Sequence, residues 1–255
     1  MNLLQGAFTA LITPMKEDGA VDYDGFRRLI QFQIEGGIDG LVPLGTTGES
    51  PTLDEAEEEK LIRLAVEEVK GRVPLIIGTG SNATRTAMHY TQRARALGVD
   101  AALVVTPYYN KPNDAGLIRH FEAVAKAGEG LPLIIYNIAS RTGRNISAEL
   151  MERLTQIPEI IGVKESSGDI NQMGDIIHRC KGRERPFTVL SGDDALTLPL
   201  LALGGDGVIS VIANLLPGKV AALVKAGLTG KGEEARHLHY QLLPFMKGAF
   251  IETNP

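Results

Sequence analysis

The chain has 255 residues, of which 26 are Lys or Arg and 31 are Asp or Glu, giving a formal net charge of −5. That balance argues against nucleic acid or an anionic membrane as the main partner, because both select basic surfaces. No apolar run approaches the roughly 18 residues that a membrane-spanning helix needs, and the amino terminus lacks the pattern of a signal peptide. The single cysteine, Cys180, excludes an intramolecular disulfide and favours a reducing, cytoplasmic compartment.

Short apolar runs alternate with amphipathic segments along the chain. The apolar runs, typical of buried strands, are 7–12, 40–44, 74–77, 101–105, 132–136, 160–164, 187–191 and 207–211. The main helical segments are 23–35, 53–70, 84–97, 116–127, 147–156, 217–226 and 233–246. This alternation predicts a parallel sheet, and eight strands favour a closed (β/α)8 TIM barrel over an open doubly wound sheet. No Gly-x-Gly-x-x-Gly follows the first strand, which argues against a dinucleotide-binding fold.

Two helix starts carry capping signals. Thr52 and Glu55 fit a capping box, so the acidic run 54–58 falls in the first turn, where carboxylates suit the helix dipole. We therefore interpret that run as a helix start and not as a metal site. Ser147, three residues before Leu150, fits the N-cap of another helix.

A lysine closes the sixth apolar run, in Ile160-Ile161-Gly162-Val163-Lys164-Glu165. Lysine is rarely buried without a partner or a task. Burial disfavours the ammonium form, and the neutral amine attacks carbonyl groups to give a Schiff base. Lys164 is therefore a candidate imine-forming residue. The alternatives are a lysine that reaches solvent past the strand end and one that pairs with Glu165.

In a barrel of this kind the active site lies where the strands end, so the residues after each strand are the candidates. Gly45-Thr46-Thr47-Gly48 offers backbone N–H groups and two hydroxyls to a carboxylate, or forms an ordinary turn. Tyr136 ends the fifth strand and either transfers protons or packs in the core. Arg141 follows it and either binds a second carboxylate or is a solvated surface residue.

Other polar residues are less promising. Asp193 and Asp194 after the seventh strand fit a capped turn better than a metal site. The glycine-rich run 204–207 allows a phosphate-binding barrel as a further class, although Lys164 and Tyr136 at adjacent strand ends argue against it. The histidines lie off the strand-end rim and are not expected to bind metal: His89, His120, His178, His237 and His239.

Taken together, the strand-end motifs resemble those of the dihydrodipicolinate synthase family, within the superfamily of pyruvate-dependent class I aldolases that includes N-acetylneuraminate lyase. The resemblance covers essentially the whole chain. It is carried by Gly45-Thr46-Thr47-Gly48-Glu49-Ser50, Thr106-Pro107-Tyr108-Tyr109-Asn110-Lys111-Pro112, Tyr136-Asn137, Ser140-Arg141-Thr142-Gly143, Gly162-Val163-Lys164-Glu165 and Gly205-Asp206-Gly207-Val208-Ile209-Ser210.

The resemblance implies a chemistry for these residues. Lys164 would form the imine with pyruvate, and the derived enamine would attack L-aspartate-4-semialdehyde and cyclise to 4-hydroxy-tetrahydrodipicolinate, at the entry to lysine and diaminopimelate synthesis. The implied proton relay is Tyr136 and Thr46, with Tyr109 from a neighbouring subunit. The implied binding residues are Thr47 and the main chain of Ile209 for the pyruvate carboxylate, and Arg141 for the semialdehyde carboxylate.

The resemblance also implies partners and assembly. No metal or organic cofactor is implied, because the lysine itself accepts the electrons. A tyrosine shared between subunits implies a homodimer or a homotetramer built as a dimer of dimers. The alternative activity is that of a sibling aldolase that cleaves a sugar acid such as N-acetylneuraminate or a 2-keto-3-deoxy acid. Arg141 and the second threonine of Thr46-Thr47 favour the synthase.

Two departures from the family pattern are visible. Ala139 stands where the family often has proline, a change that we expect the backbone to tolerate. Relatives continue through more helices beyond the last residue, Pro255, so we expect residues 1–226 to form the barrel with the active site and 227–255 to begin a truncated C-terminal helical region.

The resemblance finally bears on regulation by L-lysine. Relatives that lysine inhibits bind it near the segments that match 50–58, 82–86 and Tyr108, commonly with two histidines in the first and a glutamate in the second. This chain has Glu55 and Glu58 in the first and Thr86 in the second. Thr86 lacks the charge that would pair with the lysine α-ammonium, so we expect weak feedback inhibition or none.

Overall fold

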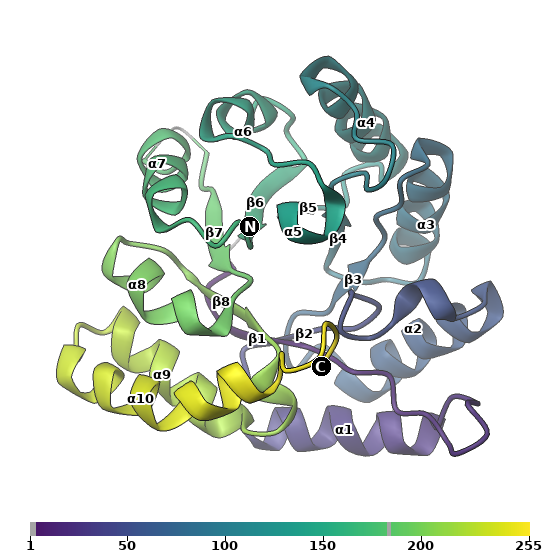
Figure 1. The fold of residues 1–255 in the computed structure, drawn as a ribbon. Helices are drawn as coiled ribbons and strands as arrows, with labels where there is room; N and C mark the ends of the chain where they lie inside the picture. The colour runs from purple at the N-terminus through teal and green to yellow at the C-terminus, as the bar shows by residue number, and fades with distance from the viewer. Residues whose placement is uncertain (1–3, 183–184) are drawn as a thin grey trace.

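The computed structural model describes residues 4–182 and 185–255, and every structural statement below refers to these residues. Figure 1 shows a ring of helices around a central barrel of strands. The strands are β1 (Gly6–Ala10), β2 (Gly40–Val42), β3 (Ile76–Gly78), β4 (Ala101–Val105), β5 (Leu133–Asn137), β6 (Ile160–Glu165), β7 (Thr188–Ser191) and β8 (Gly207–Ser210). Each predicted strand is present, with boundaries that differ by at most two residues.

The helices occupy the connections between strands and the segment after β8. They are α1 (Tyr23–Glu35), α2 (Glu55–Val69), α3 (Thr84–Ala96), α4 (Asp114–Ala127), α5 (Ala139–Thr142), α6 (Ala148–Leu154), α7 (Ile170–Cys180), α8 (Thr197–Ala202), α9 (Pro217–Leu228) and α10 (Gly232–Gly248). Short 3-10 turns lie at Ser50–Thr52, Asp194–Leu196 and Ile212–Asn214. None of these helices is long and apolar enough to cross a membrane.

The strands pair in parallel in the order β2-β1-β8-β7-β6-β5-β4-β3. The barrel closes between β2 and β3 through an isolated parallel bridge of Leu41 with Leu75 and a hydrogen bond from Leu41 N to Pro74 O of 3.0 Å. The predicted (β/α)8 barrel is therefore confirmed. The expected division at residue 226 falls within α9 and remains a prediction.

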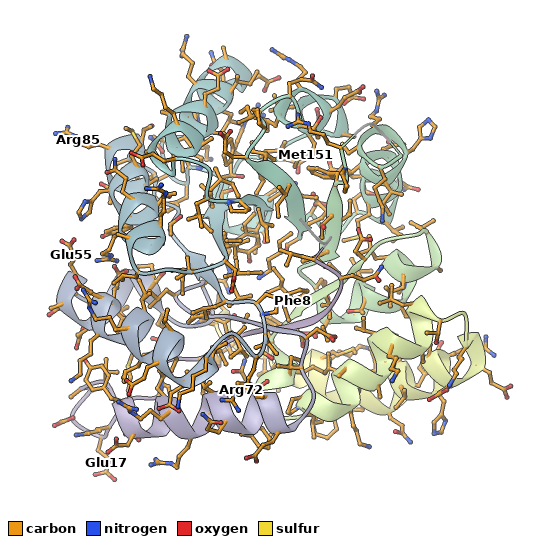
Figure 2. All side chains as sticks on the ribbon, turned by 180° about the vertical axis from the view of Figure 1, so that it is seen from behind. Phe8, Glu17, Glu55, Arg72, Arg85 and Met151 are labelled. Atoms are coloured by element: carbon orange, nitrogen blue, oxygen red, sulfur yellow. The ribbon has the colours of Figure 1, made fainter. Side chains whose placement is uncertain are left out.

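Alternation along the strands divides the apolar side chains into two cores. One fills the barrel interior: Phe8, Ala10, Val42, Ile76, Ala101, Leu103, Ile134, Tyr136, Leu190 and Ile209. The other lies between the strands and the helices, and residues such as Leu41, Ile77, Val104, Ile135 and Val189 contribute to it. Figure 2, seen from behind, places Phe8 near the centre of the barrel and Glu17 and Arg85 at its periphery.

The helix-start predictions have different outcomes. The capping box at the start of α2 is formed by Asp54 and Glu57. The Asp54 side chain accepts a hydrogen bond from Glu57 N, and the Glu57 side chain accepts one from Asp54 N. The assignment to Thr52 and Glu55 was therefore wrong, since Thr52 lies in the preceding 3-10 turn and donates to Glu49 O. Ser147 caps α6 through Leu150 N, as predicted.

Buried His120 is expected to make the stability of the fold sensitive to acid. Its Nδ1 lies 2.9 Å from Thr84 Oγ1, its Nε2 has no partner among the described residues, and burial lowers its pKa from 6.5 to about 4. The folded chain therefore binds fewer protons here than the unfolded chain as the pH falls from about 6.5 to about 4. The histidine alone should cost up to about 3 kcal/mol of stability over that window.

The test is urea unfolding from pH 7 to pH 4 with the natural chain and the His120→Asn variant. Since the variant has no imidazole to protonate, the free energies of unfolding of the two proteins should converge as the pH falls. Parallel pH curves would show that His120 does not carry the effect.

Candidate active site

Lys164 lies at the carboxyl end of β6 and is 5% exposed. In register it pairs with Tyr136 of β5 on one side and Leu190 of β7 on the other. Its Nζ lies 4.2 Å from the centre of the Tyr136 ring. Burial excludes the alternative of a lysine that extends into solvent.

Glu165 does not pair with Lys164, because neighbouring residues of a strand point to opposite faces. Glu165 accepts hydrogen bonds from Asn137 Nδ2, Ser167 N and Gln172 Nε2, on the outer side of the barrel. Burial raises the pKa of Glu165, although these hydrogen bonds oppose the effect. The alternative in which Lys164 pairs with Glu165 is therefore also excluded.

A glycine allows the lysine to lie where it does. A methyl group on Gly192, which follows β7, would collide with the Lys164 side chain and with Ser166 Oγ. Gly192 N donates to Glu165 O at 2.8 Å, which fixes the loop against β6. The close approach of this backbone therefore keeps the Lys164 stem packed at the strand end.

Residues from the carboxyl ends of β2, β3, β4 and β5 line a cavity of about 200 Å3. Thr46, Tyr136 and Arg141 of the predicted set are among its walls. Tyr136 therefore contacts both the cavity and Lys164. The lining residues are Leu44, Gly45, Thr46, Ser50, Pro51, Gly78, Gly80, Leu103, Val105, Tyr108, Tyr136, Ile138, Arg141 and Thr142.

The segment between β2 and α2 has a constrained backbone around the two threonines. Leu44 and Glu49, on either side, have φ of 56° and 55°, in the left-handed region that non-glycine residues rarely adopt. Gly48 N donates to Gly45 O, and Glu49 N donates to Thr46 O. Thr47 is buried beside Thr46. Strained backbone of this kind is concentrated at functional sites.

Arg141 lies on α5, the four-residue helix directly after β5, which Figure 1 shows at the mouth of the barrel. Its side chain is exposed, and its guanidinium donates to Thr253 O at 2.6 Å. A carboxylate at this position would add an opposite charge and could accept two parallel hydrogen bonds from the guanidinium, which a single carbonyl oxygen does not.

Two other predicted residues, Ile209 and Tyr109, are not among the residues that line the cavity. Ile209 of β8 is fully buried in the interior core that also contains Tyr136. Tyr109 is 89% exposed, with φ of 68°, and does not line the cavity of its own chain. Its neighbour Tyr108 lines the cavity instead and was not among the predicted site residues. The assignment of Tyr109 to the site of a neighbouring subunit remains a prediction.

The acidic pair after β7 forms the capped turn that was favoured. Asp193 accepts from Ala195 N, and Asp194 accepts from Ser210 Oγ and from Val211 N. Burial raises the pKa of Asp194. Among residues 4–182 and 185–255 no group of three or more His, Cys, Asp or Glu is arranged to hold a metal ion.

A buried lysine at a barrel strand end, beside a tyrosine that lines a small cavity, is an arrangement that suits Schiff-base chemistry. Residues 3–255 match the Dihydrodipicolinate synthetase family, and the chain belongs to this family.

Individual relatives cover almost the whole chain. The 4-hydroxy-tetrahydrodipicolinate synthase of Protochlamydia amoebophila is 51% identical over 252 residues, which are 99% of this chain and 84% of the relative. The dihydrodipicolinate synthase structure from Aquifex aeolicus is 48% identical, with a TM-score of 0.94 over 98% of this chain and 84% of that one. The enzyme of Cyanidioschyzon merolae, solved with lysine bound, is 39% identical, with a TM-score of 0.95 over 100% of this chain and 86% of that one.

Proposed function

We propose that the chain is a 4-hydroxy-tetrahydrodipicolinate synthase, which condenses pyruvate with L-aspartate-4-semialdehyde in lysine and diaminopimelate biosynthesis. The observation that carries the proposal is the buried Lys164 with its Nζ 4.2 Å from the ring centre of Tyr136. The names of the relatives support this activity over that of a sugar-acid aldolase.

Lys164 is the nucleophile of the proposed reaction. Its neutral amine attacks the keto carbon of pyruvate, and loss of water from the carbinolamine leaves an imine. Removal of a proton from the methyl carbon gives an enamine, which attacks the aldehyde carbon of the semialdehyde. The amino group of the semialdehyde then attacks the imine carbon, closes the ring and frees Lys164.

Tyr136 and Thr46 move protons in this scheme, with Tyr109 of a neighbouring subunit as the third member. Both Tyr136 and Thr46 line the cavity, which supports their assignment. The exposure of Tyr109 in the single chain fits a side chain that acts across an interface. We therefore propose a homodimer or a homotetramer, and we assign the protein to the cytoplasm.

Thr47 and the main chain of Ile209 bind the pyruvate carboxylate in this proposal. Thr47 lies in the constrained segment after β2, where N–H groups and hydroxyls suit an anion. Ile209 lies in the interior core with Tyr136, and its strand pairs with β1 through Phe8.

Arg141→Ala is expected to weaken use of the semialdehyde and to spare imine formation with pyruvate. Loss of a hydrogen bond to a charged group costs about 1.5–3 kcal/mol, or roughly a ten- to hundredfold rise in the KM for the semialdehyde. Steady-state kinetics with each substrate varied in turn give the result, and Arg141→Lys should retain part of the affinity. Unchanged semialdehyde kinetics would favour a sibling aldolase.

Lysine binding is expected to be weak. Glu58 is buried and forms an ion pair with Arg93, and Glu55 pairs with His89 Nε2 at 2.6 Å, so both acidic side chains are already engaged. Thr86 supplies no carboxylate for the α-ammonium of lysine. The lost charge-assisted bond should weaken binding about ten- to a hundredfold compared with an inhibited relative.

Calorimetric titration of L-lysine into the pyruvate-loaded enzyme tests this expectation. Weak heat that does not saturate is expected. Tight, saturable binding of one lysine per subunit would show that the segment binds lysine by other contacts.

The proposed activity is tested by mixing the protein with both substrates and following the reaction by NMR. Pyruvate and the semialdehyde should disappear together as the cyclic product forms. If the protein instead cleaves N-acetylneuraminate or a 2-keto-3-deoxy acid and leaves the semialdehyde untouched, the proposal is wrong.

A further inference from the structure

A cluster of buried and half-buried polar side chains lies directly behind the Lys164–Tyr136 pair, on the outer side of the barrel. It consists of Glu165, Asn137, Asn145 and Gln172, which we call the outer cluster. Asn137 and Glu165 are the residues that follow Tyr136 and Lys164, and they are paired in the same β5–β6 register. In Figure 1, β5 and β6 lie side by side within the arc of helices that includes α6 and α7.

The hydrogen bonds of Asn137 fix the orientation of its amide. Its Oδ1 accepts from Ile146 N at 3.0 Å, so its Nδ2 must face the Glu165 carboxylate. That Nδ2 lies 2.9 Å from Glu165 Oε2 and 2.9 Å from Asn145 Oδ1. The side chain of Asn137 thus bridges the end of β6 and the loop before α6.

The Glu165 carboxylate also accepts hydrogen bonds from Ser167 and from Gln172. Ser167 N lies 2.8 Å from its Oε1, and Gln172 Nε2 lies 3.3 Å from the same oxygen. Gln172 belongs to α7 and also pairs with Asn145, at 2.7 Å between Asn145 Nδ2 and Gln172 Oε1. Both Glu165 and Asn137 have no exposed surface, so water does not compete for the hydrogen bond between them.

The cluster cross-links the parts of the backbone that determine where Lys164 Nζ and Tyr136 lie. A carboxylate fully buried in this way is costly, and no ion-pair partner of Glu165 lies among residues 4–182 and 185–255. An apolar pair would fill the same space without that cost. Unlike an apolar pair, the hydrogen-bonded pair constrains the direction in which the ends of β5 and β6 face each other.

We propose that Glu165 and Asn137 are positioning residues for the imine-forming Lys164 and for Tyr136. They do not contact substrate. Their hydrogen bond fixes the adjacent strand ends, so that the amine meets the keto carbon of pyruvate and the tyrosine ring stays beside it. Since about 1 Å of misplacement costs roughly a hundredfold in rate, a change in this pair should slow imine formation by about that factor. The inference rests on the proposed function.

The donor and acceptor pattern allows a swap experiment. Glu165→Gln places an amide donor against Asn137 Nδ2, and Asn137→Asp places a carboxylate oxygen against Glu165. Each single change therefore removes the amide-to-carboxylate hydrogen bond, since the first opposes two donors and the second opposes two carboxyl groups. The double change Asn137→Asp with Glu165→Gln restores one donor and one acceptor and keeps the net charge.

The measurement is the rate at which borohydride traps the pyruvate imine, with kcat, the pyruvate KM and the melting temperature of each protein. Each single variant should lose about a hundredfold in trapping rate, and the double variant should recover most of it. The matched control is Asp206→Asn, because Asp206 is a buried carboxylate that accepts from Val189 N and pairs with Lys181 Nζ, at the start of β8. The Asp206→Asn variant should have a lower melting temperature and an unchanged trapping rate.

Two results would overturn the inference. One is a folded Glu165→Gln variant that forms the imine at the natural rate. The other is a folded double variant that is as slow as the single variants, and this result decides the matter even if the single variants fail to fold. Failure of the proposed function has a different signature, since the natural chain itself would then leave the semialdehyde untouched, whether or not it forms the pyruvate imine.

Discussion

Lys164→Ala is expected to lose turnover of pyruvate and the semialdehyde by about 10⁴-fold or more, the scale on which loss of a covalent nucleophile acts. Alanine keeps the strand but removes the amine that forms the imine. Steady-state assay at high enzyme concentration gives the residual rate, and circular dichroism checks the fold.

Lys60→Ala provides the control for this replacement. Lys60 also lies over a tyrosine ring, with its Nζ 3.6 Å from the centre of Tyr23, but on the outer side of the molecule. This variant should turn over at the natural rate. Substantial turnover by Lys164→Ala would mean that another group forms the covalent bond or that none is formed.

Tyr136→Phe is expected to lower kcat by about 10²- to 10⁴-fold, the usual contribution of a general acid or base. The change removes only the hydroxyl, so the ring remains beside Lys164 Nζ and the lysine keeps its place. The amine should therefore still form an imine with pyruvate, more slowly. The kcat and the trapping rate of this variant are measured together.

Tyr23→Phe is the matched control, because it removes a hydroxyl from another tyrosine that packs under a lysine. No loss of kcat is expected there. If Tyr136→Phe turned over as fast as the natural chain, the hydroxyl would have no part in proton transfer and Tyr136 would only support the lysine.

The position of Lys164 could be predicted because the signals are local. An apolar run that ends in a lysine predicts both the strand and the residue at its end, and the barrel brings all strand ends to one rim. The same reasoning placed Thr46, Tyr136 and Arg141 near one another, and the three line one cavity.

Other features depend on contacts between distant parts of the chain. In the outer cluster, Asn137 contacts Glu165, which lies 28 residues later in the chain. Arg141 contacts Thr253, which lies 112 residues later. No sequence pattern predicts either pairing. The α2 capping box was misplaced because Thr52 and Asp54 are both good N-cap residues with a glutamate three positions later. Only the 3-10 turn at Ser50–Thr52 decides between them.

Borohydride reduction of the natural chain in the presence of pyruvate, followed by peptide mass spectrometry, is the most direct measurement of imine formation at Lys164. One pyruvate-derived adduct per chain is expected, on the peptide that contains Lys164, and Lys164→Ala should give none. An adduct on a different lysine, equal trapping in Lys164→Ala, or no adduct in the natural chain would contradict the Schiff-base mechanism.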